Sequence, residues 1–551
     1  MKQIIMSSKW TGKSILFATI FLLSLTVFAQ QRLPIIKAGS KKVDVQDGGI
    51  FRKGIWNLSP EVKPDIYFVI GHEKENKVTF YTDIDSITFI VKPGLKYDFI
   101  ILLNGKDTCY TQILAPTPEK ISYIKPKKID QELLKQDFTV FRDSLQTLHA
   151  GLYRYKDKSE INELFDSCFA TLKNGMTEIE YFRLISFLVS AIEDGHTECF
   201  LPSGVINYLK DSLKMFPMQL RFIDGKAYVP CQTKELPAGT ELTSIDNKPI
   251  NEIKEQLYRH LSSDGSNQTG KYAKINDGHD PFFYLYYVVF GEKPAFTVEY
   301  KTSTGKLETI TLRADILKNI ECPSNPAKIE KYLQLDYKSN NVAILTIKSF
   351  SEERLSGTKE EFNNFLQSSF KEIKDKKIKK LLIDLRDNGG GDDINGEMLY
   401  SYLTNKPFRY YASVSSNTEI FTADKHPNLA IQQPNENNFK GELYFLINGK
   451  SFSGTAEFSA IARSNGRGKF IGEETGGGYY GNTSGSRATI FLPNTKIRVN
   501  IPLNKYVMAV KKFKYKDRGI IPDYPIIPTI NDILQNKDVQ LNYALRLAEK
   551  N

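Results

Sequence analysis

The fold of this chain is constrained most by a short apolar segment that is followed by a turn and then by apolar residues at helical spacing. Residues 443–447, Leu-Tyr-Phe-Leu-Ile, are followed by a turn at Asn448 and Gly449, and apolar residues then recur at helical spacing over residues 456–462. Ser453 stands at the start of this helix, where a hydroxyl can project beside the unpaired N–H groups of the first turn. Two interpretations of Ser453 follow, because a serine at a helix start is usually an N-cap but can also be a nucleophile.

A glycine-rich segment upstream favours the second interpretation. Residues 381–391, Leu-Leu-Ile-Asp-Leu-Arg-Asp-Asn-Gly-Gly-Gly, predict a buried parallel strand that opens into a loop, where missing Cβ atoms let backbone N–H groups approach a ligand. The motifs D-L-R-x-N-G-G-G, S-F-S-x-x-x-x-F and I-G-E-x-T-G-G together resemble the tail-specific (C-terminal processing) serine peptidase family, including its tricorn-like branch. Ser453 lies 19 residues before Gly472, the offset expected in that family between the nucleophile and the I-G-E glycine. The resemblance covers residues 131–548.

The resemblance implies a serine peptidase site. Ser453 would be the nucleophile, and His196 of the motif D-G-H-T would be the general base, as in the tricorn-like branch. The N–H groups of Gly390 and Gly454 would form the oxyanion hole. Taken alone, a loop histidine after a helix is usually an ordinary polar turn residue, so the assignment of the base rests on the resemblance. This chemistry needs no cofactor and no metal ion.

Four further positions refine this prediction. Many members of the family use a Ser-Lys dyad, but the lysine position of their T-F-G-K-G motif is Gly478 here, which favours a histidine-dependent mechanism. Asp517 is the candidate acid that orients the imidazole, in a segment that resembles the family's G-x-x-P-D end motif. We expect Asp523 of the same segment to shape the loop. His149, in H-A-G-L-Y, resembles the family's H-P-G-L-Y motif and is expected to be structural.

The period of the apolar residues divides the chain into segments. Short alternating runs predict an N-terminal β-sandwich, and a helical period then predicts a helical cap that carries the candidate base. Residues 236–250 resemble the PDZ domains of proteases, which bind peptides by strand addition, and both substrate capture and a structural role stay open. We expect a multidomain α/β protein with a ClpP/crotonase-like peptidase core. The predicted segments are residues 1–29 (signal peptide), 30–126 (β-sandwich), 131–210 (helical cap), 215–321 (PDZ-like module), 332–530 (tail-specific protease core) and 531–551 (C-terminal helix).

The first residues predict export. Lys2, Lys9 and Lys13 precede an apolar run at residues 15–27, and Ala29 offers a small residue for cleavage, as is typical of a secretory signal peptide. No later segment is long enough and apolar enough to span a membrane. We therefore expect a protein of the periplasm or the cell exterior, without stable membrane insertion, that acts on a peptide or protein substrate.

Composition and charge exclude several function classes. With 25% charged and 41% hydrophobic residues, the chain is an ordinary globular protein. The formal net charge of +10 is spread thinly, and the basic run at residues 374–380 is predicted to be solvated surface and not a nucleic-acid site. The five cysteines lack C-x-x-C spacing, permit one or two disulfides in an exported protein and leave an odd thiol. The oligomeric state stays open.

Two alternatives to a peptidase remain at this stage. A non-catalytic relative that binds peptides or apolar ligands would be expected to have lost Ser453 or His196, yet both are present. An α/β-hydrolase-type esterase is disfavoured because the motif G-x-S-x-G does not occur at Ser453, where Ser451 stands two residues before. The sequence therefore predicts an exported serine peptidase that is acylated at Ser453.

Overall fold

The computed structural model describes residues 67–72, 78–81, 96–103, 107–114, 125–323, 329–338 and 341–550. The chain divides into two compact units, Met1–Ser122 and Tyr123–Asn551. In the first unit the described strands form one antiparallel sheet in the order β2-β1-β3-β4, made of β1 (Tyr67–His72), β2 (Val78–Tyr81), β3 (Lys96–Leu103) and β4 (Asp107–Leu114). A sandwich needs a second sheet, so the predicted β-sandwich stays a prediction, and the predicted signal peptide lies outside the described residues.

The second unit begins with a helical segment. Its helices are α2 (Gln131–Leu148), α3 (Lys158–Ala170), α4 (Glu178–Ala191) and α5 (Ser203–Ser212). Capping boxes start two of them, because Asp157 and Thr177 each exchange hydrogen bonds with the glutamate three residues later. Phe138, Phe141 and Phe165 pack edge to face between α2 and α3. The predicted helices are present, and the role of this segment as a cap stays a prediction.

An antiparallel sheet with helices follows in the part of the chain predicted to be PDZ-like. The sheet has the order β14-β13-β11-β10-β9, with β12 paired to β11. Its strands are β9 (Arg221–Ile223), β10 (Lys226–Tyr228), β11 (Glu241–Ile245), β12 (Lys248–Pro249), β13 (Ala295–Lys301) and β14 (Leu307–Arg313), and its helices are α6 (Ile250–Tyr258), α7 (Thr269–Asn276) and α8 (Phe282–Phe290). Pairing of β8 (Lys214–Met215) with β15 (Asp315–Ile316) closes the module, and a disulfide joins Cys231 to Cys322. The PDZ assignment stays a prediction.

A mainly parallel sheet forms the core of the rest of the chain. Its order is β16-β17-β18-β22-β23-β26, and only β16 runs antiparallel to its neighbour. The strands are β16 (Leu333–Lys338), β17 (Val342–Ile347), β18 (Lys380–Asp384), β22 (Glu442–Ile447), β23 (Lys469–Gly472) and β26 (Tyr524–Pro525). Parallel strands joined by helices confirm the predicted α/β character of this part of the chain.

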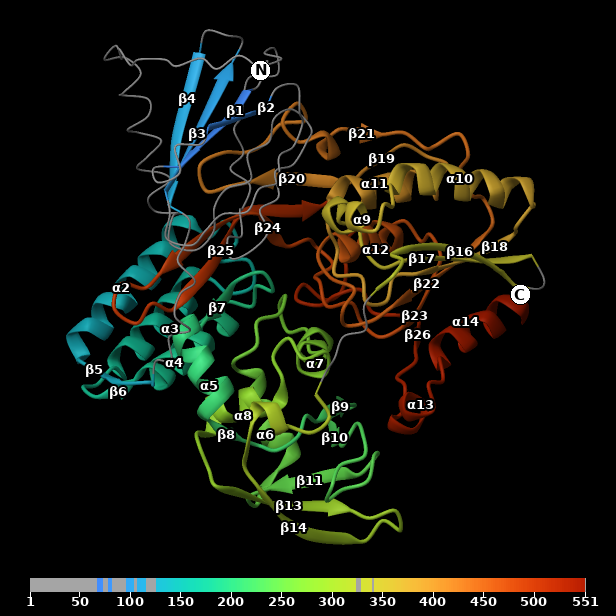
Figure 1. The fold of residues 1–551 in the computed structure, drawn as a ribbon. Helices are drawn as coiled ribbons and strands as arrows, with labels where there is room; N and C mark the ends of the chain where they lie inside the picture. Colours follow the sequence, from blue (N-terminus) through green and yellow to red (C-terminus); the bar gives the residue numbers. More distant parts are fainter. Residues whose placement is uncertain are drawn as a thin grey trace. The chain divides into compact units, whose positions relative to one another are not determined.

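Helices cover both faces of this sheet, which explains why consecutive residues in the middle of its central strands are apolar. Leu381 and Ile383 pack in one core with residues of α10 (Phe362–Asp375), α11 (Asp393–Ser401) and α12 (Gly454–Ser464). Leu382, between them in the sequence, packs on the other face against α14 (Val539–Lys550). Figure 1 shows the three helices and α14 on opposite sides of the sheet.

A second sheet connects the helical segment to the core. β25 (Arg498–Met508) pairs with β20 (Tyr411–Ser415) and β24 (Thr483–Phe491), and also with β7 (Glu198–Phe200), which follows α4. Through β25, the loop before β7 has a defined position relative to the parallel sheet.

The smaller elements are β5 (Lys128–Ile129), β6 (Met176–Thr177), η1 (Leu317–Asn319), α9 (Glu352–Gly357), β19 (Phe408–Arg409), η2 (Pro427–Leu429), β21 (Ile431–Gln432) and α13 (Ile530–Leu534).

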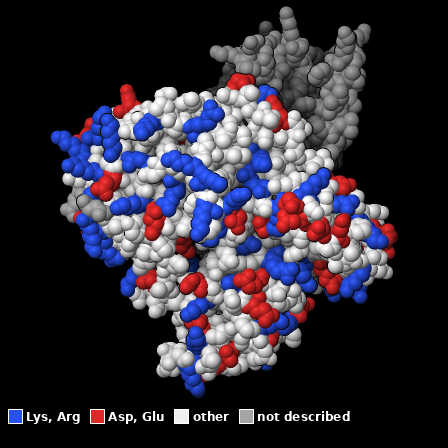
Figure 2. Space-filling model, turned by 180° about the vertical axis from the view of Figure 1, so that it is seen from behind, with Lys and Arg blue, Asp and Glu red and all other residues white. Residues whose placement is uncertain are grey.

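The surface carries charges of both signs. Figure 2 shows one face of the molecule, where Lys and Arg side chains stand among Asp and Glu side chains in small groups. The basic run at the end of α10 is largely exposed. Two lysines there form ion pairs with acidic residues four positions away, Lys371 with Asp375 and Lys376 with Glu372. Among the residues that the structure describes, no helix combines the length and the apolar character needed to cross a membrane.

Candidate active site

Ser453 lies at the turn between β22 and α12, where the sequence predicts it. Its φ of 53° is a left-handed conformation that residues with a side chain rarely adopt, so the turn is strained. Although Ser453 occupies the N-cap position, its side chain makes no capping hydrogen bond. The Oγ atom instead lies 3.1 Å from Nε2 of His196. The geometry therefore suits a nucleophile paired with a base better than it suits an N-cap.

His196 lies in the loop between α4 and β7, 257 residues away from Ser453 in the sequence. The Asp194 carboxylate shapes this loop, because its Oδ1 accepts hydrogen bonds from the N–H groups of His196 and Thr197, both at 2.9 Å, and from the Thr197 hydroxyl at 3.1 Å. The imidazole stacks on the ring of Phe452, with 4.6 Å between the ring centroids. Both the loop and the ring of His196 are thus held in place beside Ser453.

The structure does not bring the Asp517 carboxylate to His196. The backbone carbonyl of Asp517 accepts a hydrogen bond from the N–H of Ser266 at 3.0 Å, whereas its side chain has no hydrogen bond or ion pair with any residue described. Within the same set of residues, the Nδ1 atom of His196 is buried without a hydrogen-bond partner. The role predicted for Asp517, orientation of the imidazole, therefore has no contact to support it.

Two other buried carboxylates interact electrostatically with His196. Burial opposes ionisation of Asp194, but electrostatic interactions with His149 and His196 hold the pKa of its carboxyl below its ordinary value. Burial raises the pKa of the Asp264 carboxyl, against an opposing effect of His196. Asp194 stands within the D-G-H-T motif and could have been found there. Asp264 has no such signal, since it lies in a polar loop of the predicted PDZ-like module.

The predicted oxyanion donors differ in their present partners. The N–H of Gly454 opens α12 and has no hydrogen bond among the described residues. Gly390 lies directly against the serine turn, because a Cβ added to it would stand 2.9 Å from the Cβ of Ser453, but its N–H donates to Oδ1 of Asn388 at 2.9 Å. The N–H of Gly391, which the sequence did not single out, has no hydrogen bond within the described chain and lies close to Gly454.

The segment of residues 475–478 packs beneath the serine turn. A Cβ added to Gly477 would lie 2.6 Å from the Cβ of Ala456 and 3.1 Å from the nitrogen of Ser453, so only glycine fits there without a shift. The N–H of Gly478, which is predicted to stand at the dyad lysine position, donates to Oδ2 of Asp264 at 3.1 Å. Lys450, a lysine close in sequence, forms ion pairs with Asp277 and Asp387. No lysine makes a contact with Ser453 in the described part of the chain.

Comparison with known proteins identifies the domain that carries Ser453. Residues 341–526 match the model of peptidase family S41. The chain therefore carries a peptidase family S41 domain, which contains Ser453 and the glycine-rich loop at residues 389–391, whereas His196 lies outside the matched residues. The match supports the predicted peptidase assignment for this domain, and the tail-specific and tricorn-like assignments stay predictions. A search of curated proteins found no match.

Solved structures share the fold at low sequence identity. Mature CPAF complexed with lactacystin is 14% identical, with a TM-score of 0.52, over 76% of this chain and 97% of that one. A crystal structure of mature CPAF gives 14% identity, a TM-score of 0.51 and coverages of 76% and 96%. The tricorn protease is 11% identical over 86% of this chain and 42% of that one, with a TM-score of only 0.31. The likeness to the two CPAF structures concerns the fold alone.

Two residues near the S41 site have structural contacts, as the sequence predicts. His149 is buried, its Nδ1 accepts the N–H of Gly151 at 3.1 Å, and its Nε2 therefore carries the proton that bonds to the Thr197 hydroxyl at 2.8 Å. Burial lowers the pKa of His149. Asp523 accepts the N–H of Phe470 at 2.8 Å and forms an ion pair with Arg463, contacts that hold the loop before β26.

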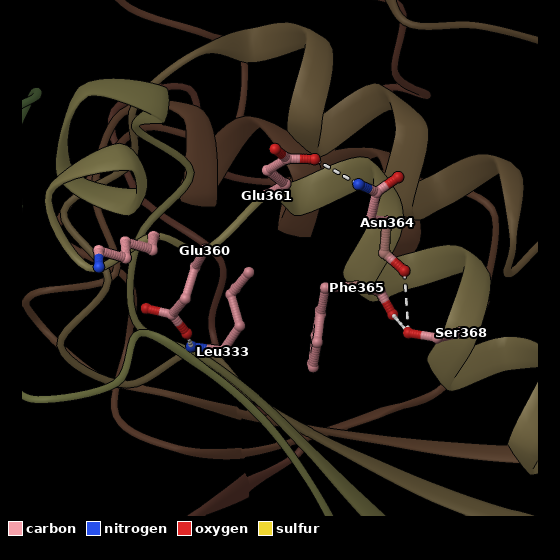
Figure 3. A pocket seen from close by; sticks show the side chains of 7 residues that line it. Leu333, Glu360, Glu361, Asn364, Phe365 and Ser368 are labelled. Atoms are coloured by element: carbon pink, nitrogen blue, oxygen red, sulfur yellow. Dashed lines mark hydrogen bonds between the residues drawn. The ribbon is translucent and has the colours of Figure 1, made fainter.

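Two cavities of the second unit lie apart from Ser453 and His196. One of about 400 Å³ is open to solvent between β16 and the start of α10, and Figure 3 shows Glu360 turned toward the backbone of Leu333, whose N–H it accepts at 2.9 Å. The other, of about 610 Å³, lies between the disulfide-bearing module and the ends of β17, β18 and β22. Neither is lined by Ser453 or His196. The described part of the chain has no group of three or more His, Cys, Asp or Glu side chains that could hold a metal ion.

Proposed function

We propose that the protein is an exported serine peptidase in which Ser453 is the nucleophile and His196 the general base, as in the tricorn-like branch. The peptidase family S41 domain supports a peptidase acting on peptides or proteins. The single observation that carries the assignment of residues is the 3.1 Å distance between Nε2 of His196 and Oγ of Ser453, which joins two segments far apart in the sequence. A serine hydroxyl is a weak nucleophile until such a base takes its proton.

The reaction follows from this geometry. Nε2 of His196 takes the proton of Ser453 as Oγ attacks the carbonyl carbon of the peptide bond, and the resulting imidazolium then protonates the leaving amine. Water hydrolyses the acyl-enzyme with the same base. The oxyanion of the tetrahedral intermediate is stabilised by the N–H of Gly454, with Gly390 or Gly391 as the second donor. For the N–H of Gly390 to donate to the oxyanion, its hydrogen bond to Oδ1 of Asn388 must break or become shared between the two acceptors.

The structure supports the peptidase over the two alternatives. A non-catalytic binding protein has no need to keep a strained serine within hydrogen-bond distance of a histidine, and strained backbone at such a site is retained where it serves chemistry. An esterase of the α/β-hydrolase type stays disfavoured, because the matched family is a peptidase family.

Labelling with a fluorophosphonate tests the assignment of Ser453. We expect stoichiometric labelling of the wild-type protein, none of Ser453→Ala, and unchanged labelling of Ser486→Ala, an exposed serine of β24 that serves as the matched control. Turnover of an unstructured protein and of a simple ester by the same preparation separates a peptidase from an esterase. Labelling that persists in Ser453→Ala would assign the nucleophile to another residue.

Export is the remaining part of the proposal. It rests on the lysines and the apolar run of residues 1–29. Expression in a Gram-negative host followed by fractionation and N-terminal sequencing tests it. We expect a periplasmic protein whose first residue follows Ala29, and an intact leader in the cytoplasmic fraction would contradict export.

A further inference from the structure

One polar loop of the predicted PDZ-like module reaches the segment that carries His196. This loop, Ser-Ser-Asp-Gly-Ser-Asn at residues 262–267, lies between α6 and α7 and is called the bridging loop below. Oδ1 of Asp264 accepts the N–H of Gly195 at 2.8 Å, and the N–H of Gly265 donates to the carbonyl of Glu193 at 2.9 Å. Gly195, immediately before His196, and Glu193, three residues before it, are thus hydrogen-bonded to the bridging loop.

The same loop also binds the S41 domain on the side of Ser453. Oδ2 of Asp264 accepts the N–H of Gly478 at 3.1 Å, and the side-chain amide of Asn267 donates to the carbonyl of Thr475 at 2.6 Å. Thr475 is the first and Gly478 the last residue of the glycine segment that packs beneath the serine turn. Within this segment Gly477 lies against the backbone nitrogen of Ser453. Asp264 is therefore hydrogen-bonded with one oxygen to the histidine loop and with the other to the segment below the serine.

Asp264 is suited to this position as a charged group. Its side chain is only 1% exposed, and both of its oxygens accept peptide N–H donors, which is the pattern of an ionised carboxylate. Burying an unpaired charge would cost several kcal/mol, and hydrogen bonds to backbone donors offset that cost. The other titratable groups that interact with it are Asp194, His196, Tyr155 and Glu457. Only His196 among these can become positively charged.

We propose that Asp264 is a positioning residue that sets the distance between His196 and Ser453 and stabilises the protonated imidazole formed during the reaction. The proposal rests on the function proposed above and adds to it a residue from a different part of the chain. Two loops that each carry one reacting group can move independently, and a buried carboxylate bonded to both removes that freedom. Its negative charge also favours the imidazolium in an environment with little water.

The variant Asp264→Asn tests both parts of this role. An amide keeps the shape but loses the charge and replaces one acceptor oxygen by a donor, which then faces a peptide N–H. We expect kcat to fall by about tenfold or more, a part of the roughly 10²–10⁴-fold that a positioned base contributes, with little change in KM. Loss of the charge also disfavours the imidazolium, so the acid limb of the kcat/KM profile should move to lower pH.

Asp137→Asn is the matched control. Asp137 is also fully buried and also accepts two backbone N–H groups, those of Asn494 and Thr495 at 2.7 and 2.8 Å, but it ties α2 to the turn between β24 and β25. Both variants should lose some thermal stability, whereas only Asp264→Asn should change kcat and the pH profile. Asp264→Glu, which keeps the charge, should recover the position of the acid limb even if kcat stays low.

The outcomes separate this proposal from the proposed function. If the wild-type protein does not react with a fluorophosphonate at Ser453, the proposed function fails and the role of Asp264 fails with it. If Ser453 is labelled but Asp264→Asn and Asp137→Asn behave alike in kcat and pH profile, Asp264 is a structural residue only and the positioning role is overturned. If Asp264→Asn does not fold, an acid limb that is shifted in the folded Asp264→Glu despite the retained charge overturns the role as well.

Discussion

At the scale of single residues, the site depends on one strained serine and one loop histidine. Ser453 has a positive φ, and it lacks the capping hydrogen bond that a serine at this position usually makes. Its hydroxyl lies within hydrogen-bond distance of His196 instead. In the proposed mechanism the two side chains share one proton transfer. Their contributions to the rate should therefore not be additive.

This gives the first prediction, for the variants Ser453→Ala, His196→Ala and the double variant. Each single variant should lower kcat by at least about 10³-fold on a peptide substrate, and the double variant should be no more than a few fold worse than either, because each removes the same proton transfer. Single-turnover kinetics with matched thermal melts as a folding control provide the measurement. A His196→Ala variant that keeps most of the wild-type rate would show that another group is the base.

A second prediction compares two acids. The Asp517 carboxylate makes no hydrogen bond with a described residue, while Asp264 is bonded to both sides of the site. We therefore expect Asp517→Asn to lower kcat less than Asp264→Asn and far less than Ser453→Ala. Parallel kcat measurements on the three variants decide the order. A larger loss in Asp517→Asn would return the orienting role to Asp517.

At the scale of elements, α12 combines the serine with a buried acid one turn further along. Glu457 is 3% exposed and accepts hydrogen bonds from the Tyr411 hydroxyl at 2.7 Å and the Asn482 amide at 2.6 Å. Burial, with a contribution from Asp393, raises the pKa of Glu457 to about 7. The carboxyl of Glu457, one turn after Ser453, therefore titrates near neutral pH.

The third prediction concerns the stability of this element. The pKa of Glu457 is raised on folding from 4.5 to about 7, so its contribution is complete below pH 4.5 and is lost as the pH rises through 7. The loss amounts to at most about 3 kcal/mol, from roughly 1.4 kcal/mol for each pKa unit. Thermal melts between pH 5 and 9 should show a smaller decline for Glu457→Gln than for the wild type. The exposed Glu353→Gln should keep the wild-type slope, and equal slopes in all three proteins would contradict the raised pKa.

At the scale of the molecule, three parts of the second unit meet at the site. The histidine loop follows α4, the bridging loop lies between α6 and α7, and the serine turn precedes α12. The middle part contains the disulfide between Cys231 and Cys322, which are 91 residues apart, while Cys168 and Cys199 are free thiols. This agrees with the expectation of one or two disulfides with an odd thiol. The cross-link therefore constrains the module that supplies Asp264.

The fourth prediction is that this disulfide stabilises the second unit. Replacing both cysteines by serine should lower the free energy of unfolding by about 2–4 kcal/mol, because the unfolded chain gains freedom when a long loop is opened. Urea denaturation with and without a reductant gives the measurement. The reductant should lower the midpoint of the wild type and leave that of the double variant unchanged, and an unaffected wild type would mean that the bond adds nothing to stability.

The sequence by itself determined the α/β core and the two motifs of the S41 domain. Residues 381–383 and 443–447 are apolar at every position, a pattern that suits parallel strands covered on both faces, and helices do cover both faces. The glycines after β18 and the strand-turn-helix around Ser453 are equally local signals. Each is encoded within about a dozen neighbouring residues, where steric rules for glycine and the spacing of apolar side chains act directly.

Only the tertiary structure decided which groups meet. His196 approaches Ser453 across 257 residues, and Asp264 joins Gly195 and Gly478 across 69 and 214 residues. Asp517 was predicted from its sequence motif to orient the imidazole. Its backbone carbonyl, and not its carboxylate, bonds to the bridging loop. These contacts arise from the docking of loops that belong to different elements. No periodic pattern in the sequence records such docking, because it depends on the packing of whole surfaces and not on neighbours along the chain.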